Sequence, residues 1–228
     1  MHRPAPLLLV LVTAGVVVVA LALLVMSGAS HAFDEAVIGV LRHPELVDPL
    51  AFLWPVTELG STWAVTLLAG VAIALGVLIG PWRHGIIAAA VIAGASLLNG
   101  TLKRVIARER PELLAPMLTE SGYSFPSGHS ALGMVGWGVL AVLVSRTRLP
   151  RVARIGIVAV FGLIVFLVGV SRVYLGVHYP TDVIAGWLLG AVIVVLFAQV
   201  TREVSREPSA AAVDADPAAP RSDRPGAG

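Results

Sequence analysis

The chain has 228 residues, of which 57% are hydrophobic and only 13% are charged, with a mean hydropathy of +0.88 and a formal net charge of +2. Soluble domains carry about 25% charged residues, so this composition excludes an ordinary soluble globular domain. The absence of cysteine excludes disulfides, thiol catalysis and zinc–thiolate sites. The small net charge gives no reason to expect a nucleic-acid partner.

Apolar runs recur along the chain, each about 20 residues long and therefore able to cross a bilayer core of about 30 Å as a helix. Backbone polar groups in lipid must be paired within their own segment, which favours helices. The sequence thus predicts an all-α fold, a polytopic membrane bundle with six transmembrane helices. The predicted spans are residues 7–26, 61–80, 85–102, 128–145, 155–170 and 181–200.

The chain is expected to divide into one membrane domain, residues 1–204, and a tail, residues 205–228. The sequence motifs described below fall within a core of this domain, residues 61–200. The tail is rich in Ala, Pro, Asp and Arg and has no apolar period. This composition predicts a disordered cytoplasmic segment.

The N-terminal region allows two interpretations. Ser30-His31-Ala32 follows a basic start and an apolar stretch, as at a signal-peptide cleavage site. The apolar stretch exceeds the roughly 7–15 residues of a signal peptide, so a retained span is favoured. The next apolar residues have helical spacing, which predicts either a short helix in the membrane interface or an ordinary amphipathic connector. These residues are Phe33, Val37, Val40 and Leu41.

Lys and Arg in the short loops indicate orientation, because they concentrate on the cytoplasmic side. A cytoplasmic N-terminus explains the arginines at both ends of the chain and in the second and fourth interhelical loops. It leaves a second group of cations on the outer side, where topology disfavours them. An anionic ligand is the simplest cause of this group. Its members are Arg42, Lys103, Arg104, Arg108, Arg110 and Arg172.

The first candidate cluster is Lys103 followed, seven positions later, by Arg110 and Pro111. Positions seven apart share a helix face after two turns, so the two cations point to one place if the helix extends that far. Pro111 disfavours helical geometry at Arg110. A patch of cations bound to lipid headgroups is the alternative interpretation.

The second cluster is Pro126-Ser127-Gly128-His129, at the start of the fourth span. Helix N-termini bind phosphate through free backbone N–H groups and the helix dipole. His129 in the first turn would lie beside such a phosphate. A simple Ser cap with an interfacial His is the alternative.

The third cluster is Ser171-Arg172, His178 and Asp182, around the start of the sixth span. A carboxylate at the edge of the hydrocarbon requires a partner. If Asp182 holds one nitrogen of His178, the other is available as base or nucleophile. A salt bridge from Asp182 to Arg172, or a favourable charge at the helix N-terminus, is the alternative.

Together, Lys103…Arg110-Pro111, Pro126-Ser127-Gly128-His129 and Ser171-Arg172…His178…Asp182 resemble the three signatures of the type-2 phosphatidic acid phosphatase superfamily. The resemblance implies that His178 is a nucleophile that forms a phosphohistidine and that Asp182 orients it. It also implies that His129 protonates the leaving lipid oxygen. The implied phosphate ligands are Lys103, Arg110, Ser127, Gly128 and Arg172.

The resemblance implies a lipid phosphatase without metal or cofactor, acting on phosphatidate, phosphatidylglycerophosphate or undecaprenyl diphosphate. Glu109, Glu112 and Glu120 lie outside the signatures and are interpreted as surface or loop residues. The expected location is the plasma membrane, with both termini cytoplasmic and the site facing outward among membrane lipids. The signatures leave the substrate and the oligomeric state open.

Three other functions use similar residues. A phosphotransferase would pass the phosphoryl group to a second lipid. A lipid phosphate transporter would keep the cations but would not need the His178–Asp182 pair. A vanadium haloperoxidase has similar signatures but is soluble, which the predicted spans disfavour.

Overall fold

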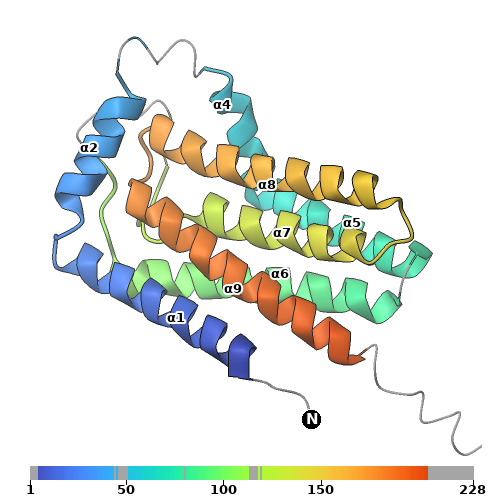
Figure 1. Ribbon diagram of the computed structural model, residues 1–228. Coiled ribbons are helices and arrows are strands. Elements are labelled where there is room, and N and C mark those ends of the chain that lie inside the picture. Colours follow the sequence, from blue (N-terminus) through green and yellow to red (C-terminus); the bar gives the residue numbers. More distant parts are fainter. Residues whose placement is uncertain are drawn as a thin grey trace, which may run out of the picture.

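The computed structural model describes residues 5–43, 45, 51–79, 81–112, 118 and 120–204. Helices dominate this part of the chain, and it contains no strand (Figure 1). The predicted tail, 205–228, lies outside the described residues. The elements are α1 (Ala5–Met26), α2 (His31–Leu41), α4 (Leu53–Val56), η1 (Thr57–Gly60), α5 (Thr62–Ile79), α6 (Trp82–Ile106), α7 (Gly128–Ser145), α8 (Arg151–Tyr174) and α9 (Pro180–Val204).

The long helices form one bundle around α7, which packs against α5, α6, α8 and α9 (Figure 1). α1 lies along α9 at the edge of the bundle, and α4 and η1 lie against α8. Among the described residues, α6, α7, α8 and α9 are each long and apolar enough to cross a membrane. The number reaches six if α1 with α2, bent by 90°, and α4–η1 with α5, bent by 53°, each count as one span. The predicted all-α membrane bundle is confirmed, and the protein is an integral membrane protein.

Local sequence signals explain where the helices begin and end. Pro81 and Pro150 precede α6 and α8, and Pro180 is the first residue of α9, where a missing backbone N–H has no cost. α6 ends at Ile106 and α8 at Tyr174, both beyond the predicted 102 and 170. These longer helices carry Lys103 and Arg172 in their last turns.

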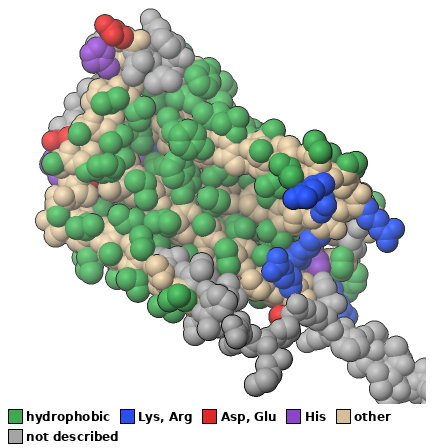
Figure 2. Space-filling view, viewed as in Figure 1, with side chains coloured by type: hydrophobic (Ala, Val, Ile, Leu, Met, Phe, Trp, Pro, Cys, Tyr) green, Lys and Arg blue, Asp and Glu red, His purple; other side chains and the backbone are tan. Residues whose placement is uncertain are grey.

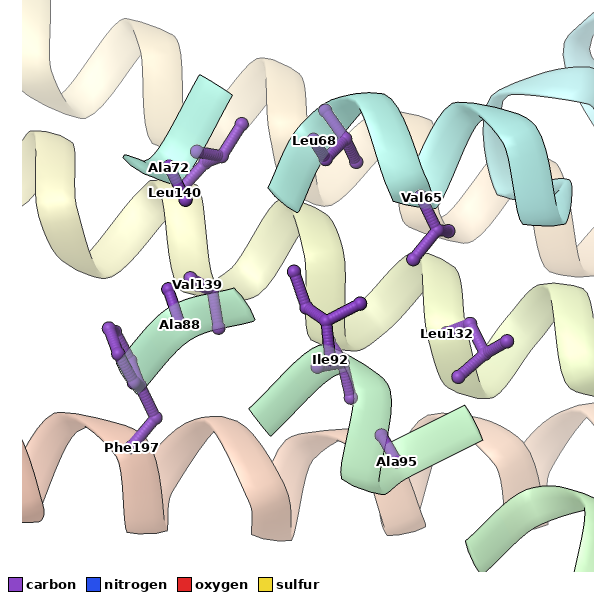
Figure 3. Close-up of a cluster of buried hydrophobic side chains, with 11 residues drawn as sticks. Val65, Leu68, Ala72, Ala88, Ile92, Ala95, Leu132, Val139, Leu140 and Phe197 are labelled. Carbon is purple, nitrogen blue, oxygen red and sulfur yellow. The ribbon is translucent and has the colours of Figure 1, made fainter. Parts of the chain in front are cut away.

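A buried apolar cluster joins α5, α6, α7 and α9 (Figure 3). Val135 and Val139 on α7 are completely buried at its centre. Small side chains on α5 and α6, Ala72 and Ala88, are also fully buried and let the two helices approach closely. The bundle is therefore tightly packed through the middle of the spans.

Two glycines on α9 bring this helix against α7. A Cβ at Gly186 would lie 2.8 Å from the Ser127 carbonyl oxygen, and one at Gly190 would lie 2.8 Å from the Ala131 carbonyl oxygen. No side chain fits into these distances, so both positions require glycine. This contact joins the start of α7 to the start of α9.

The outer surface of the bundle is apolar, as expected for helices that face lipid (Figure 2). Cationic side chains gather at the end where α7 joins α8 (Figure 2). At the opposite end, the C-terminal turns of α6 and α8 meet the N-terminal turns of α7 and α9. The three sequence clusters are carried by these four helix ends, so the fold brings them together.

Candidate active site

The structure gathers all eight predicted site residues at one end of the bundle. Lys103 and Arg172 lie in the last turns of α6 and α8, and Asp182 lies in the first turn of α9. Arg110 reaches the group from the segment after α6, because the helix ends before it. The remaining four lie at the start of α7 or just before α9: Ser127, Gly128, His129 and His178.

His178 and Asp182 form a buried pair. The His178 Nδ1 lies 3.2 Å from Asp182 Oδ2, which also accepts the Tyr179 backbone N–H at 3.0 Å. The His178 side chain is 1% exposed. Burial lowers the pKa of His178 to about 4, although the bond to Asp182 acts in the opposite direction. His178 is therefore neutral at neutral pH, with Nε2 directed away from Asp182.

That nitrogen lies 3.4 Å from Arg110 Nη1, and a carboxylate lies in front of it. The Glu120 Oε2 is 4.0 Å from His178 Nε2 and 3.2 Å from Arg110 Nη2. Its other oxygen, Oε1, accepts a hydrogen bond from Arg172 Nη2. Arg110, Arg172 and His178 thus surround the Glu120 carboxylate.

Glu120 lies in a loop, as predicted, but its side chain pairs with Arg110 and Arg172 in this site, which the sequence did not indicate. Burial raises the pKa of Glu120, but the positive charges around it, that of Arg172 first, outweigh burial and hold that pKa below its ordinary value. Glu120 is therefore ionised. No spacing in the sequence pointed to it, because it lies in a segment without helical period.

Both arginines also donate hydrogen bonds to protein oxygens other than those of Glu120. Arg172 is fully buried, and its Nη1 donates to Thr57 Oγ1 at 2.7 Å. Arg110 donates to the carbonyl oxygens of Val177, Gly122 and Ser121 at 2.8, 3.0 and 3.2 Å. The Arg172 Nε is buried without a partner among the described residues.

Lys103 also contacts the loop before α7. Its Nζ donates to the carbonyl oxygens of Tyr123 and Ser124 at 2.7 and 3.2 Å. Its Cε lies 3.9 Å from where a Cβ on Gly128 would be, beside the start of α7. Lys103 therefore links the end of α6 to the N-terminus of α7.

Ser127 caps α7, which is the alternative role considered for it from the sequence. Its hydroxyl accepts the Ser130 backbone N–H at 3.4 Å and the Ser130 hydroxyl at 3.0 Å. The Ser127 backbone N–H donates to the Asp182 carbonyl oxygen at 3.0 Å. His129 is partly buried in the first turn of α7. It lies close enough to Arg172, Glu120 and Lys103 for their charges to act on its imidazole.

Arg108 is the charged partner of Asp182, so the suggested salt bridge between Asp182 and Arg172 is wrong. The Arg108 Nη1 lies 2.6 Å from Asp182 Oδ1, and its Nη2 lies 2.7 Å from Asp34 Oδ2. The sequence placed Arg108 among the outer cations, secondary to the predicted phosphate ligands, as a residue that adds to their positive field or binds lipid headgroups. Asp34, on α2, is fully buried.

The site can supply nucleophilic and acid–base chemistry toward an anion. It has a buried imidazole oriented by a carboxylate, a second imidazole, three cations and a helix N-terminus. Among the described residues, no three His, Asp or Glu side chains are grouped so as to hold a metal ion.

The fold and this site define a class: integral membrane helical proteins with a histidine-containing anion site at one end of the bundle. The family model of the PAP2 superfamily matches residues 84–206, and the chain belongs to that superfamily. Its phosphatases are hydrolases that act on lipid phosphates.

Named relatives support this membership. The chain is 33% identical over 186 residues to phosphatidylglycerophosphatase B of Bacillus subtilis. The matched stretch covers 79% of this chain and 87% of that protein. It is 39% identical over 113 residues to undecaprenyl-diphosphatase of Sulfolobus acidocaldarius, covering 46% of this chain and 50% of that protein. The crystal structure of the PAP2-type phosphatidylglycerolphosphate phosphatase of Bacillus subtilis matches with a TM-score of 0.74 at 31% identity, covering 86% of this chain and 98% of that chain.

Proposed function

We propose that the protein removes a phosphoryl group from a lipid phosphate or diphosphate through a phosphohistidine at His178. The observation that carries the proposal is the position of the Glu120 carboxylate. It lies between Arg110 and Arg172 and 4.0 Å from His178 Nε2, so these groups already bind an anion in front of a neutral imidazole nitrogen. A substrate phosphate would take the place of Glu120.

In the first step, His178 Nε2 attacks phosphorus while the bond from phosphorus to the lipid oxygen breaks. Asp182 stabilises the positive charge that develops on the imidazole. His129 donates a proton to the leaving lipid oxygen, which departs as an alcohol or a lipid monophosphate. Arg110, Arg172 and Lys103 neutralise the equatorial oxygens, which is the main requirement of phosphoryl transfer.

In the second step, water attacks the phosphohistidine and the bond from phosphorus to Nε2 breaks. His129, left neutral by the first step, accepts a proton from the water. The products are inorganic phosphate and free His178. Cations and a helix N-terminus perform the charge stabilisation in both steps, so the proposal includes independence from metal ions.

Several features favour a lipid over a soluble substrate. The site lies at the ends of four spans, where a headgroup can bind while its chains remain in the bilayer. Two of the relatives are named as phosphatases of phosphatidylglycerophosphate and undecaprenyl diphosphate, which makes these two lipids the first candidates. We place the protein in the plasma membrane with cytoplasmic termini and an outward-facing site, because the arginines between α7 and α8 and at the C-terminal end of α9 lie at the other end of the bundle.

A phosphotransferase is the second candidate, because the phosphohistidine can pass its phosphoryl group to a lipid alcohol instead of water. A non-enzymatic transporter would not require the buried His178–Asp182 pair. A haloperoxidase of the soluble kind is disfavoured by the membrane spans.

The test is phosphate release from a lipid panel by the purified protein in detergent with EDTA. The panel contains phosphatidylglycerophosphate, undecaprenyl diphosphate and phosphatidate, and His178→Ala is the control. We expect release from at least one lipid by the wild type and none by the variant. Release that persists in His178→Ala, or that requires an added metal, would contradict the proposal. If no phosphate appears, product analysis with an added lipid alcohol tests the transferase.

A further inference from the structure

Behind His178, a buried row of charged groups extends away from the anion site. Asp182 bonds His178 through Oδ2 and Arg108 through Oδ1, and Arg108 then bonds Asp34. The Arg108 guanidinium also lies over the Tyr179 ring, 3.8 Å from its centroid. Asp34 comes from α2, the short helix bent by 90° from α1. The row therefore connects this outlying helix to the imidazole.

The Asp34 side chain is buried and accepts several hydrogen bonds, like the side chains of the site itself. Its side chain is fully buried, and it accepts the Thr181 backbone N–H at 2.9 Å and the Thr181 hydroxyl at 2.8 Å. Arg108 Nη1 also donates to Thr181 Oγ1, at 2.9 Å. A buried carboxylate without partners is very costly, and here every partner belongs to the wall behind His178.

The charges in this row do not balance by pairs. Arg108 has one positive charge, and Asp34 and Asp182 have one negative charge each. With neutral His178 the row has a net charge of −1, and with His178 cationic, as in the phosphohistidine, it is neutral. Without Asp34, Arg108 would neutralise Asp182 and leave nothing to balance a cationic His178. Electrostatic interactions are strong in such a buried place.

We propose that Asp34 is a positioning residue for phosphoryl transfer, which occupies Arg108 so that Asp182 keeps its negative charge available to His178. This inference rests on the proposed function of His178. Asp34 does not touch the anion site, so its effect is on the chemical step and not on substrate binding.

The first test is Asp34→Asn, which keeps the shape and removes the charge. We expect kcat to fall by about tenfold, the loss typical for an outer partner of a site group, while KM changes less than about twofold. The matched control is Glu35→Gln, because Glu35 is the adjacent residue, is exposed and pairs only with exposed His31 among the described residues. The substrate is phosphatidylglycerophosphate, or undecaprenyl diphosphate if the wild type hydrolyses that lipid faster.

The second test separates charge from structure. Asp34→Asn combined with Arg108→Gln removes one negative and one positive charge, so the row regains its net charge of −1. We expect this double variant to have a higher kcat than Asp34→Asn alone. A purely structural role predicts that the double variant is as slow or slower, and that result would overturn the proposal, as would an unchanged kcat in Asp34→Asn.

Should Asp34→Asn not yield a monodisperse protein, two double variants decide the question. Asp34→Asn/Arg108→Gln and Asp34→Asn/Arg108→Lys differ by one positive charge beside Asp182. We expect the lysine variant to have the lower kcat, and equal values would overturn the proposal. A wild type inactive on all three panel lipids would overturn the proposed function, whereas an active wild type, an inactive His178→Ala and an unaffected Asp34→Asn would overturn this inference alone.

Discussion

The two ends of the bundle both have several cations, but their partners differ. At the site end, Arg108 and Arg172 bond the carboxylates of Asp34, Asp182 and Glu120. At the other end, Arg146 donates to the Thr201 hydroxyl at 2.7 Å and Arg154 to the Ser145 carbonyl oxygen at 2.7 Å. Arginine thus pairs with carboxylates at one end and with neutral oxygens at the other.

This difference explains why loop charge alone was ambiguous. Cations on the side that topology disfavours were expected to have an anionic ligand, and the structure supplies carboxylates of the protein itself. The orientation rule counts Lys and Arg and gives carboxylates little weight, so the carboxylates at the site end do not alter that count. Each prediction below changes one end and leaves the other intact.

The largest effect is expected from His129→Gln. Without a general acid, kcat on a lipid phosphate should fall by about 10²- to 10⁴-fold. With para-nitrophenyl phosphate, whose leaving group needs no proton, the loss should be much smaller. Steady-state kinetics on the two substrates measures the contrast, and equal losses on both would exclude the general-acid role.

Arg172→Ala should follow. It removes a buried donor from the anion site, and the loss of such a donor costs about 10²- to 10³-fold in rate. The matched control at the other end is Arg154→Ala, for which we expect nearly wild-type kcat/KM. If both variants lose activity equally, the division between the two ends is wrong.

A smaller effect is expected on stability as pH falls. Folded His178 has a pKa of about 4, below the ordinary 6.5 of the unfolded chain. Between these two values the unfolded chain binds more protons than the folded protein, so the free energy of unfolding decreases as the pH is lowered. The loss should approach about 3 kcal/mol once the pH reaches 4. Melting temperatures in detergent should therefore drop more steeply with acid in the wild type than in His178→Gln. Parallel curves would contradict the prediction.

Glu120→Gln should change binding more than chemistry. Removing the carboxylate that occupies the anion position should strengthen inhibition by orthovanadate severalfold and lower KM. The control is Glu35→Gln, because Glu35 is exposed on α2 and pairs with His31. Weaker inhibition in Glu120→Gln would mean that the carboxylate helps to hold the ligand.

The smallest effect is expected from the double variant Arg148→Gln/Arg151→Gln, at the end away from the site. Both residues are exposed, and activity in detergent should stay within about twofold of wild type, as usual for surface substitutions. A large loss in the purified, folded protein would mean that this end takes part in the reaction.

The sequence was sufficient to predict the helical bundle, and its motifs named eight candidate residues that the structure places at one end of that bundle. His178 and Asp182 are four positions apart and meet across the start of one helix. Asp34 and Glu120 could not be predicted in the same way. Asp34 bonds Thr181, 147 positions away, and Glu120 bonds Arg172, 52 positions away. Such pairs depend on how whole helices pack, which no local pattern encodes.

The unpaired Nε of Arg172 has a consequence for the shape of the ligand. A carboxylate is flat and has two acceptor oxygens. In Glu120 one oxygen pairs with Arg110 and the other with Arg172, and the Arg172 Nε–H has no partner among the described residues. A phosphoryl group is tetrahedral and has a third oxygen outside that plane. A phosphate bound in place of Glu120 would therefore offer an acceptor to a buried donor that the carboxylate leaves without a partner among the described residues.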